Sequence, residues 1–310
     1  MKMNNILKTT ALLLGSSVLL SGCIKETFPE SGYATSDQTA ESPFAKEGLI
    51  TAMPTVLITN YTDLGEHIDF GYPGIFGATD RMVGEVFPVS GNLPGGNQYY
   101  DRRQAWLYPG NSTGLAANGW ASPFFYTNYY KFIFTANEAI DIANQSEGAE
   151  EMMGIAKTFR ALCYLDLARL YDALPAKAPE RPAYETELEA VKGLTVPIVR
   201  EDTSMEELEN NPRVSREEMF KFIFEDLNTP PPAETLLANY TPATKNLPSL
   251  AVIYGLKARA YLWLGGFTES YAEVPTGDAA YRLAAEYARK AIDASGCTIM
   301  TESQWLDPKT

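Results

Sequence analysis

Apolar residues recur with a helical period over two long stretches in the middle of the chain. The first follows a typical helix start at Ser122 and Pro123 and keeps a 3.6-residue spacing to Asn144. The second covers residues 149–172 and ends before Pro175. It carries apolar residues on two sides, and a helix of that kind packs against neighbours on both, as the inner helices of a solenoid do.

Three further helices are predicted in the second half of the chain. A capping box that starts at Ser215 opens one of them, which three consecutive prolines end. The others cover about 249–264 and 278–295, the last with Asp278 as its cap and a glycine after its final residue. Residues 175–212 contain five prolines, so we expect irregular excursions between the helices.

An internal repeat links two of these helices. Residues 159–167 line up with residues 256–264 at an offset of 97, with small residues, a tyrosine and two leucines at matching places. Alternating small and large residues let the helices of tetratricopeptide units approach closely. The sequence therefore predicts an all-α fold, a tetratricopeptide-like superhelix of helical hairpins with long irregular loops. The alternative is two ordinary amphipathic helices whose likeness is accidental.

The start of the chain is typical of an export signal. Two lysines precede an apolar run over residues 9–20, which is too short to cross a bilayer as a permanent helix. The run ends in Leu20-Ser21-Gly22-Cys23, which matches the bacterial lipobox. We expect residues 1–22 to be a signal peptide, Cys23 to carry the lipid, and residues 23–42 to form a flexible tether. The alternative is a secreted protein with a chance cysteine near its cleavage site.

The charge and the scarce metal-binding residue types exclude several classes of function. The chain has 25 Lys and Arg against 39 Asp and Glu, a formal net charge of -14, so it lacks the positive charge with which proteins bind nucleic acid. One histidine, His67, and three cysteines are too few for a Cys/His zinc site, and any catalytic triad would depend on that single imidazole. Most familiar hydrolase and metalloenzyme designs are therefore disfavoured, and we expect no catalytic residues, no metal and no cofactor.

Two cysteines lie outside the export signal. Cys163 falls inside a strongly helical apolar stretch, and Cys297 lies near a helix end. A disulfide between them is one possibility in an oxidising compartment, and a buried free thiol is the commoner fate of such a residue.

Several spaced motifs follow one another along the chain. They are Tyr130-Lys131-Phe132-Ile133-Phe134-Thr135-Ala136-Asn137-Glu138-Ala139-Ile140, Ala156-Lys157-Thr158-Phe159-Arg160-Ala161, Gly193-Leu194-Thr195-Val196-Pro197-Ile198-Val199, Arg213-Val214-Ser215, and Ala258-Arg259-Ala260-Tyr261-Leu262. Taken in this order, they resemble those of the SusD/RagB-like outer-membrane lipoproteins. With the lipobox, the resemblance covers most of the chain that remains after export.

The resemblance implies a nutrient-binding protein at the cell surface that performs no bond chemistry. Such a protein is anchored by lipid in the outer membrane, faces the exterior, and serves polysaccharide utilisation by binding oligosaccharide or, in some members, peptide. It delivers this ligand to a TonB-dependent, SusC-like transporter. The alternatives are a helical-repeat lipoprotein scaffold that binds only protein or peptide partners and, less favoured, a lipid-anchored hydrolase.

The chain departs from the family pattern in three respects. Ile155 stands where the family often has glutamate, and Asp172 stands where it often has glycine. Family members usually run well past 310 residues, so residues 43–310 resemble the N-terminal part of such a protein, a SusD-like helical-repeat domain incomplete at its C-terminus.

A loop before the first long helix is the candidate ligand site. Exposed Trp and Tyr rings can stack on the apolar face of a sugar, while Asn, Gln and Arg bond its hydroxyl groups. The loop over residues 92–120 is rich in these residue types, and no family motif transfers a binding residue to it. The alternative is that its aromatic rings only pin the loop to the helices. The candidates for a glycan site are Asn97, Gln98, Tyr99, Tyr100, Arg102 and Trp106.

Overall fold

The computed structural model describes residues 36–58, 121–172, 189–228 and 232–307, and these residues form helices and one isolated β-bridge. The helices are α2 (Ser36–Glu41), α3 (Pro43–Ile58), α7 (Ala121–Asn144), α8 (Glu150–Tyr171), α10 (Met205–Glu209), α11 (Arg216–Asn228), α12 (Ala233–Leu236), α13 (Leu250–Gly265), α14 (Gly277–Ser295) and α15 (Glu302–Trp305). The predicted helical fold is confirmed.

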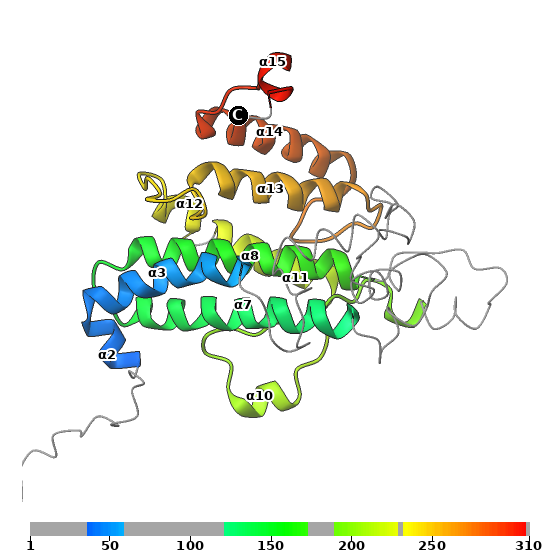
Figure 1. Ribbon diagram of the computed structural model, residues 1–310. Helices are drawn as coiled ribbons and strands as arrows, with labels where there is room; N and C mark the ends of the chain where they lie inside the picture. The colour runs from blue at the N-terminus through cyan, green and yellow to red at the C-terminus, as the bar shows by residue number, and fades with distance from the viewer. Residues whose placement is uncertain (1–35, 59–120, 173–188, 229–231, 308–310) are drawn as a thin grey trace, which may run out of the picture.

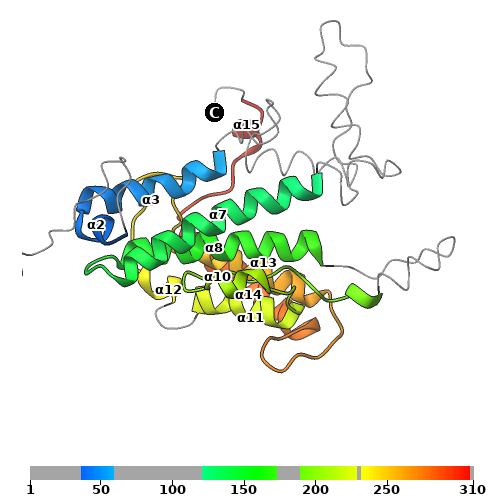
Figure 2. The same cartoon turned by 90° about the horizontal axis from the view of Figure 1, so that it is seen from below.

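The helices are arranged as antiparallel hairpins stacked in layers. Helices α7 and α8 form one hairpin, and α13 and α14 form another (Figure 1). Helices α11 and α12 lie between the two hairpins and contact both α8 and α13. Helix α3 packs against α7 and α8 (Figure 2), and α14 with α15 forms the end of the stack. This is the hairpin architecture that the internal repeat predicts.

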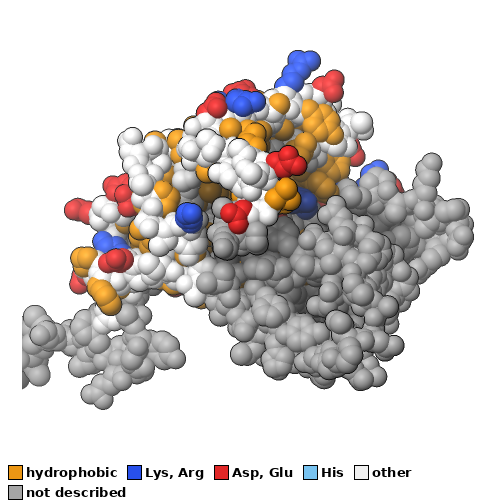
Figure 3. All heavy atoms as spheres, turned by 45° about the horizontal axis from the view of Figure 1, so that its top comes forward, with side chains coloured by type: hydrophobic (Ala, Val, Ile, Leu, Met, Phe, Trp, Pro, Cys, Tyr) orange, Lys and Arg blue, Asp and Glu red, His pale blue; other side chains and the backbone are white. Residues whose placement is uncertain are grey.

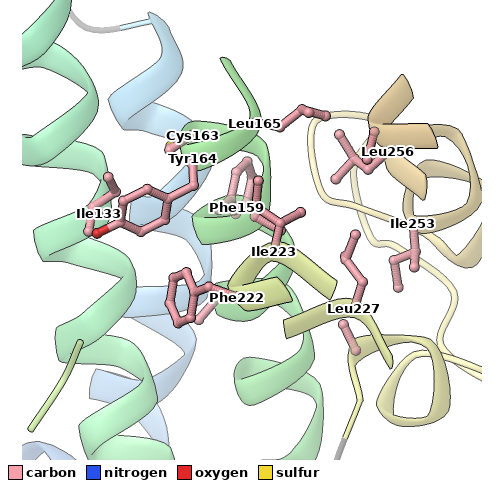
Figure 4. Close-up of a cluster of buried hydrophobic side chains, with 14 of the residues drawn as sticks. Ile133, Phe159, Cys163, Tyr164, Leu165, Phe222, Ile223, Leu227, Ile253 and Leu256 are labelled. Atoms are coloured by element: carbon pink, nitrogen blue, oxygen red, sulfur yellow. The ribbon is translucent and has the colours of Figure 1, made fainter. Parts of the chain in front are cut away.

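Helix α8 is the centre of the core, as its two apolar sides predict. Ile155, Tyr164 and Leu165 are fully buried, although they point to different sides of the helix. Figure 4 shows Phe159 and Tyr164 of α8 among side chains of α7, α11 and α13. Burying a side chain of this size stabilises the fold by roughly 1.5–3 kcal/mol, so the contacts of α8 contribute a large share of the hydrophobic stabilisation.

Glycines allow close approach at two helix contacts. A Cβ atom at Gly154 would lie 2.8 Å from Cγ of Leu237, at the end of α12. A Cβ atom at Gly265 would lie 2.4 Å from the ring of Tyr281, across the α13–α14 hairpin. Both distances are shorter than van der Waals contact, so each position needs a residue without a side chain for the helices to meet as they do.

The helix ends confirm some predicted caps and correct others. At Ser215 the hydroxyl accepts from the backbone nitrogen of Glu218 at 3.2 Å, and the Glu218 carboxylate accepts from the Ser215 nitrogen at 2.9 Å, which is the predicted capping box. Helix α14 begins one residue before Asp278, so its cap is Thr276 and Asp278 lies in the first turn. Helix α7 likewise begins at Ala121, one residue before the predicted cap.

The structure also describes the end of the predicted tether and the two cysteines outside the export signal. Residues 36–41, expected at the end of the tether, form α2, which packs against α3 and α7. Cys163 is buried and Cys297 is exposed, and both thiols are free. The possibility of a disulfide between them is therefore wrong, because one side chain is enclosed by the core and the other points to solvent.

The two unusual residues of the central helix region are both buried. Ile155 is fully enclosed, as its apolar character requires. Asp172 pairs with Arg216, whose Nε and Nη2 atoms donate to the two carboxylate oxygens at 2.5 and 3.0 Å. The same guanidinium lies 3.6 Å over the ring of Phe267 and donates to the hydroxyl of Tyr271 at 2.7 Å. An aspartate at 172 thus ties the end of α8 to the start of α11.

Candidate functional site

The residues singled out from the sequence as lipid-bearing or ligand-binding lie outside the described residues. They are Cys23, Asn97, Gln98, Tyr99, Tyr100, Arg102 and Trp106. Lipid attachment and glycan contact through these side chains therefore stay predictions. Helix α7 directly follows the candidate loop, so its first turns are the described part of the chain nearest to that loop in sequence.

A cluster of three tyrosines lies where α7 begins and α8 ends. The ring of Tyr126 is centred 4.4 Å from that of Tyr130 and 5.9 Å from that of Tyr171. Tyr126 is 38% exposed, so one flat aromatic ring faces solvent on a support of two others. Such a ring can stack on the apolar face of a sugar. The helical period alone assigns this stretch to the helix core, although the four-residue spacing of Tyr126 and Tyr130 already indicates neighbouring rings on one side of the helix.

The hydroxyl of Tyr130 acts as a hydrogen-bond donor. It donates to the backbone oxygen of Pro197 at 2.5 Å. Burial raises the pKa of Tyr130 far above its ordinary value, and the neighbouring Tyr164 and Tyr126 add to the effect. The hydroxyl therefore stays protonated and donates, which positions the ring beneath Tyr126.

The non-helical segment 195–201 is fixed to the helices by side chains that bond to its backbone. The hydroxyl of Tyr164 donates to the oxygen of Val199 at 3.1 Å and accepts from its nitrogen at 2.8 Å. Asn137 donates to the same oxygen at 3.0 Å. A half-buried backbone outside helices and sheets needs such partners, so side chains of α7 and α8 hold this segment in place.

A buried ionic network anchors the end of this segment. Arg160 of α8 donates to both carboxylate oxygens of Asp226, at 2.8 and 2.7 Å, and to Oδ1 of Asn137 at 2.8 Å. It also pairs with Glu201. Burial alone would lower the pKa of Arg160, yet the two carboxylates raise it above the ordinary value. The guanidinium stays charged and joins α7, α8, α11 and the segment 195–201.

An open pocket of about 800 Å³ lies beyond this segment, against α10. Its lining combines an apolar side with hydroxyl, amide, guanidinium and carboxylate groups. Much of the polar lining holds the loop together: Asn211 donates to the oxygen of Ile198 at 2.7 Å, and Thr203 accepts from the nitrogen of Arg200 at 2.8 Å. The lining residues are Ile198, Arg200, Thr203, Ser204, Glu206, Glu207, Asn210, Asn211, Pro212 and Val214.

These groups supply hydrogen-bonding and stacking surfaces. Within the described ranges, His, Cys, Asp and Glu side chains form no group of three or more that could hold a metal ion. The same part of the chain contains no helix that is long and apolar enough to cross a membrane. The arrangement around the tyrosine cluster is suited to holding a polar ligand with an apolar face.

Comparison with known proteins identifies the fold. No protein-family model matches the chain, and no curated protein matches it by sequence. A SusD-like carbohydrate binding protein from Bacteroides vulgatus ATCC 8482 is similar in structure, with 18% identity and a TM-score of 0.56 over 84% of this chain and 46% of that one. A SusD-like protein from Bacteroides fragilis NCTC 9343 has 15% identity and a TM-score of 0.53 over 82% and 39%. The chain spans less than half of either solved structure, and over that part it has the fold of SusD-like proteins.

Proposed function

We propose that this protein is a SusD-like lipoprotein of the cell surface that binds oligosaccharides. The observation that carries the proposal is the structural similarity to two SusD-like proteins, one of them described as carbohydrate binding. The exposed Tyr126 ring, which follows the candidate loop closely in sequence, supports it, because sugar recognition requires stacking rings and hydrogen-bonding side chains.

The glycan site is placed at the loop that precedes α7, together with the tyrosine cluster. In this proposal Tyr99, Tyr100 and Trp106 stack on sugar rings, and Asn97, Gln98 and Arg102 bond the hydroxyl groups. Tyr126 extends the stacking surface onto the first turns of α7.

Calorimetry against a panel of oligosaccharides tests this site. Trp106→Ala and Tyr126→Ala should each weaken binding about five- to tenfold, since a stacked aromatic contributes roughly 1–1.5 kcal/mol at a binding surface. Phe134→Ala is the matched control, because Phe134 is an exposed aromatic on the same helix, two turns further along. Unchanged affinity in Trp106→Ala would remove the loop from the site, and a panel without any binding would refute glycan recognition.

Anchoring is proposed to occur through the thiol of Cys23. Cys23→Ser should abolish incorporation of labelled fatty acid and release the protein from the membrane fraction, because two or more acyl chains are needed for stable attachment. A Cys163→Ser variant is the control, since that thiol is buried in the core. Membrane attachment that survives Cys23→Ser would refute the lipid anchor.

Delivery of the ligand to a TonB-dependent, SusC-like transporter is the last part of the proposal. The measurement is co-purification of a large β-barrel protein with the tagged chain from the native outer membrane. Glycan binding without any such partner would leave a receptor that acts alone. Turnover of a bound glycan would instead indicate the hydrolase alternative, and partner binding without glycan binding would indicate the scaffold alternative.

A further inference from the structure

The loop over residues 195–214, which we call the α10 loop, encloses the open pocket of about 800 Å³ between its own two limbs. Backbone bonds close its base: the nitrogen of Thr195 donates to the oxygen of Val214 at 2.8 Å, and the nitrogen of Val214 donates to the oxygen of Val196 at 3.4 Å. Side chains of α7 and α8 hold the first limb. The pocket is therefore formed in advance, with a volume that suits a small ligand.

Several polar side chains of the lining are bonded within the protein, and two are left for a ligand. The Arg200 guanidinium pairs with a carboxylate of α11 at 2.8 Å, and the Ser204 hydroxyl donates to the Glu207 carboxylate at 2.8 Å. The side chains of Glu206 and Asn210 have no ion-pair or hydrogen-bond partner among the described residues. These two residues are four apart, so they lie on one side of α10, and both line the pocket.

Negative charge is concentrated in the α10 loop. Residues 201–209 contain five carboxylates and no Lys or Arg. Helix α14, at the opposite end of the stack (Figure 1), instead carries three acidic and three basic side chains. Figure 3, in which that end is turned forward, shows Lys and Arg beside Asp and Glu. A local excess of one sign attracts ligands of the other sign, so the α10 loop favours cations.

We propose that this pocket binds an organic cation, namely an ammonium or guanidinium group on a short apolar stem. The Glu206 carboxylate accepts a charge-assisted hydrogen bond from the cationic group, and the amide oxygen of Asn210 accepts a second one. The stem lies against the apolar side of the pocket, which Ile198, Pro212 and Val214 form. A free amine and a lysine or arginine side chain of a polypeptide share this chemistry. The proposal goes beyond glycan recognition and does not depend on it.

Calorimetry at low ionic strength with pentylamine tests the site, and pentanol is the neutral probe of the same length. We expect pentylamine to bind at least about tenfold more tightly than pentanol, since a hydrogen bond between charged groups is stronger than one between neutral groups. Glu206→Gln should weaken pentylamine binding about tenfold, because it removes that charge. Glu209→Gln is the matched control: it removes the same charge from the same helix, but Glu209 does not line the pocket. Both side chains are exposed, so the substitutions leave the core intact.

Equal weakening in the two variants would overturn the proposal, because the acidic loop would then only attract counterions. Absence of pentylamine binding, or pentanol binding of the same strength, would overturn it as well. Nα-acetyl-lysine amide separates the two sources of the cation. Binding at least as tight as that of pentylamine indicates a lysine side chain of a polypeptide, and binding of pentylamine alone indicates a free amine. No sugar enters these measurements, so their outcome is independent of the proposed function.

Discussion

Removal of the Asp226 carboxylate is the most direct test of what holds the candidate site in place. Asp226→Asn keeps the volume of the side chain but leaves Arg160 without its bidentate partner. Arg160 is only 2% exposed, so its charge cannot turn to water. Breaking a buried ion pair by removing one partner costs about 3–5 kcal/mol. Asn137 and Glu201 still bond the guanidinium, so we expect the lower end, about 3 kcal/mol.

A loss of that size is a large fraction of the 5–15 kcal/mol that is typical of folded domains. Urea unfolding at pH 7, followed by the helical circular dichroism signal, measures it. Glu225→Gln is the matched control, because Glu225 lies on the same helix and pairs with Arg200 at 2.8 Å, but the two side chains are 33% and 43% exposed. We expect that control to cost less than about 1 kcal/mol.

The reasoning would be refuted if Asp226→Asn cost no more than its control. A second comparison separates charge from packing: Arg160→Met with Asp226→Leu should recover most of the loss, since well-packed apolar residues of similar volume often replace a buried pair at no net cost. Failure of that recovery would mean that the polar bonds of Arg160 to the segment 195–201 matter more than its charge.

Three further predictions concern the packing and charge of the stack. Gly154→Ala adds a methyl group against α12 and should lower stability by about 1–3 kcal/mol, read as a fall in the thermal midpoint; an unchanged midpoint would mean that α12 can move aside. Glu234→Ala leaves the buried Lys257 without its carboxylate and should cost about 3 kcal/mol in urea unfolding, which Lys257→Met in the same chain should restore. Burial opposes ionisation of Glu201, but its guanidinium partner outweighs this and holds the pKa below the ordinary value. The stabilisation that Glu201 contributes is therefore fully present above about pH 4.3, the pKa of an unfolded Glu, and is lost as the pH falls through the lower pKa of the folded state. Glu201→Gln should be less stable than the natural chain at pH 7. The difference in stability should shrink below about pH 4.

The long helices could be predicted from the sequence because the pattern that indicates a helix involves residues close together in the chain. Helices α7, α8, α11, α13 and α14 each carry an apolar stripe of period 3.6, and each bond along the helix joins residues four apart. The short helices α10, α12 and α15 have four or five residues, which is too few for a period to show. Helix α3 contains Pro54 in its interior, a residue that argues against a helix on propensity alone and is tolerated here by packing on α7 and α8.

The candidate site was harder to predict because its parts come from distant places in the chain. Tyr126 and Tyr171 belong to different helices, and the hydroxyl of Tyr130 finds its acceptor at Pro197, 67 residues away. Loop residues obey no period, so composition alone marked the candidate loop, and composition does not say which ring faces solvent. A single sequence shows that aromatic and amide side chains are present, but the folded structure is needed to show which of them contact one another.

The internal repeat places two buried cationic side chains at matching positions. The alignment that pairs residues 159–167 with 256–264 places Arg160 opposite Lys257, and charge alone would assign both to solvent. Both are buried, and each meets a carboxylate from outside its own helix, Asp226 for Arg160 and Glu234 for Lys257. In each hairpin, the inner helix therefore has one buried cationic side chain that pairs with a carboxylate on α11 or α12. Because an unpaired buried charge is costly, a register that separates either cation from its carboxylate would be disfavoured. The repeated cation thus ties each inner helix to a carboxylate of the helices between the hairpins, Arg160 to Asp226 of α11 and Lys257 to Glu234 of α12.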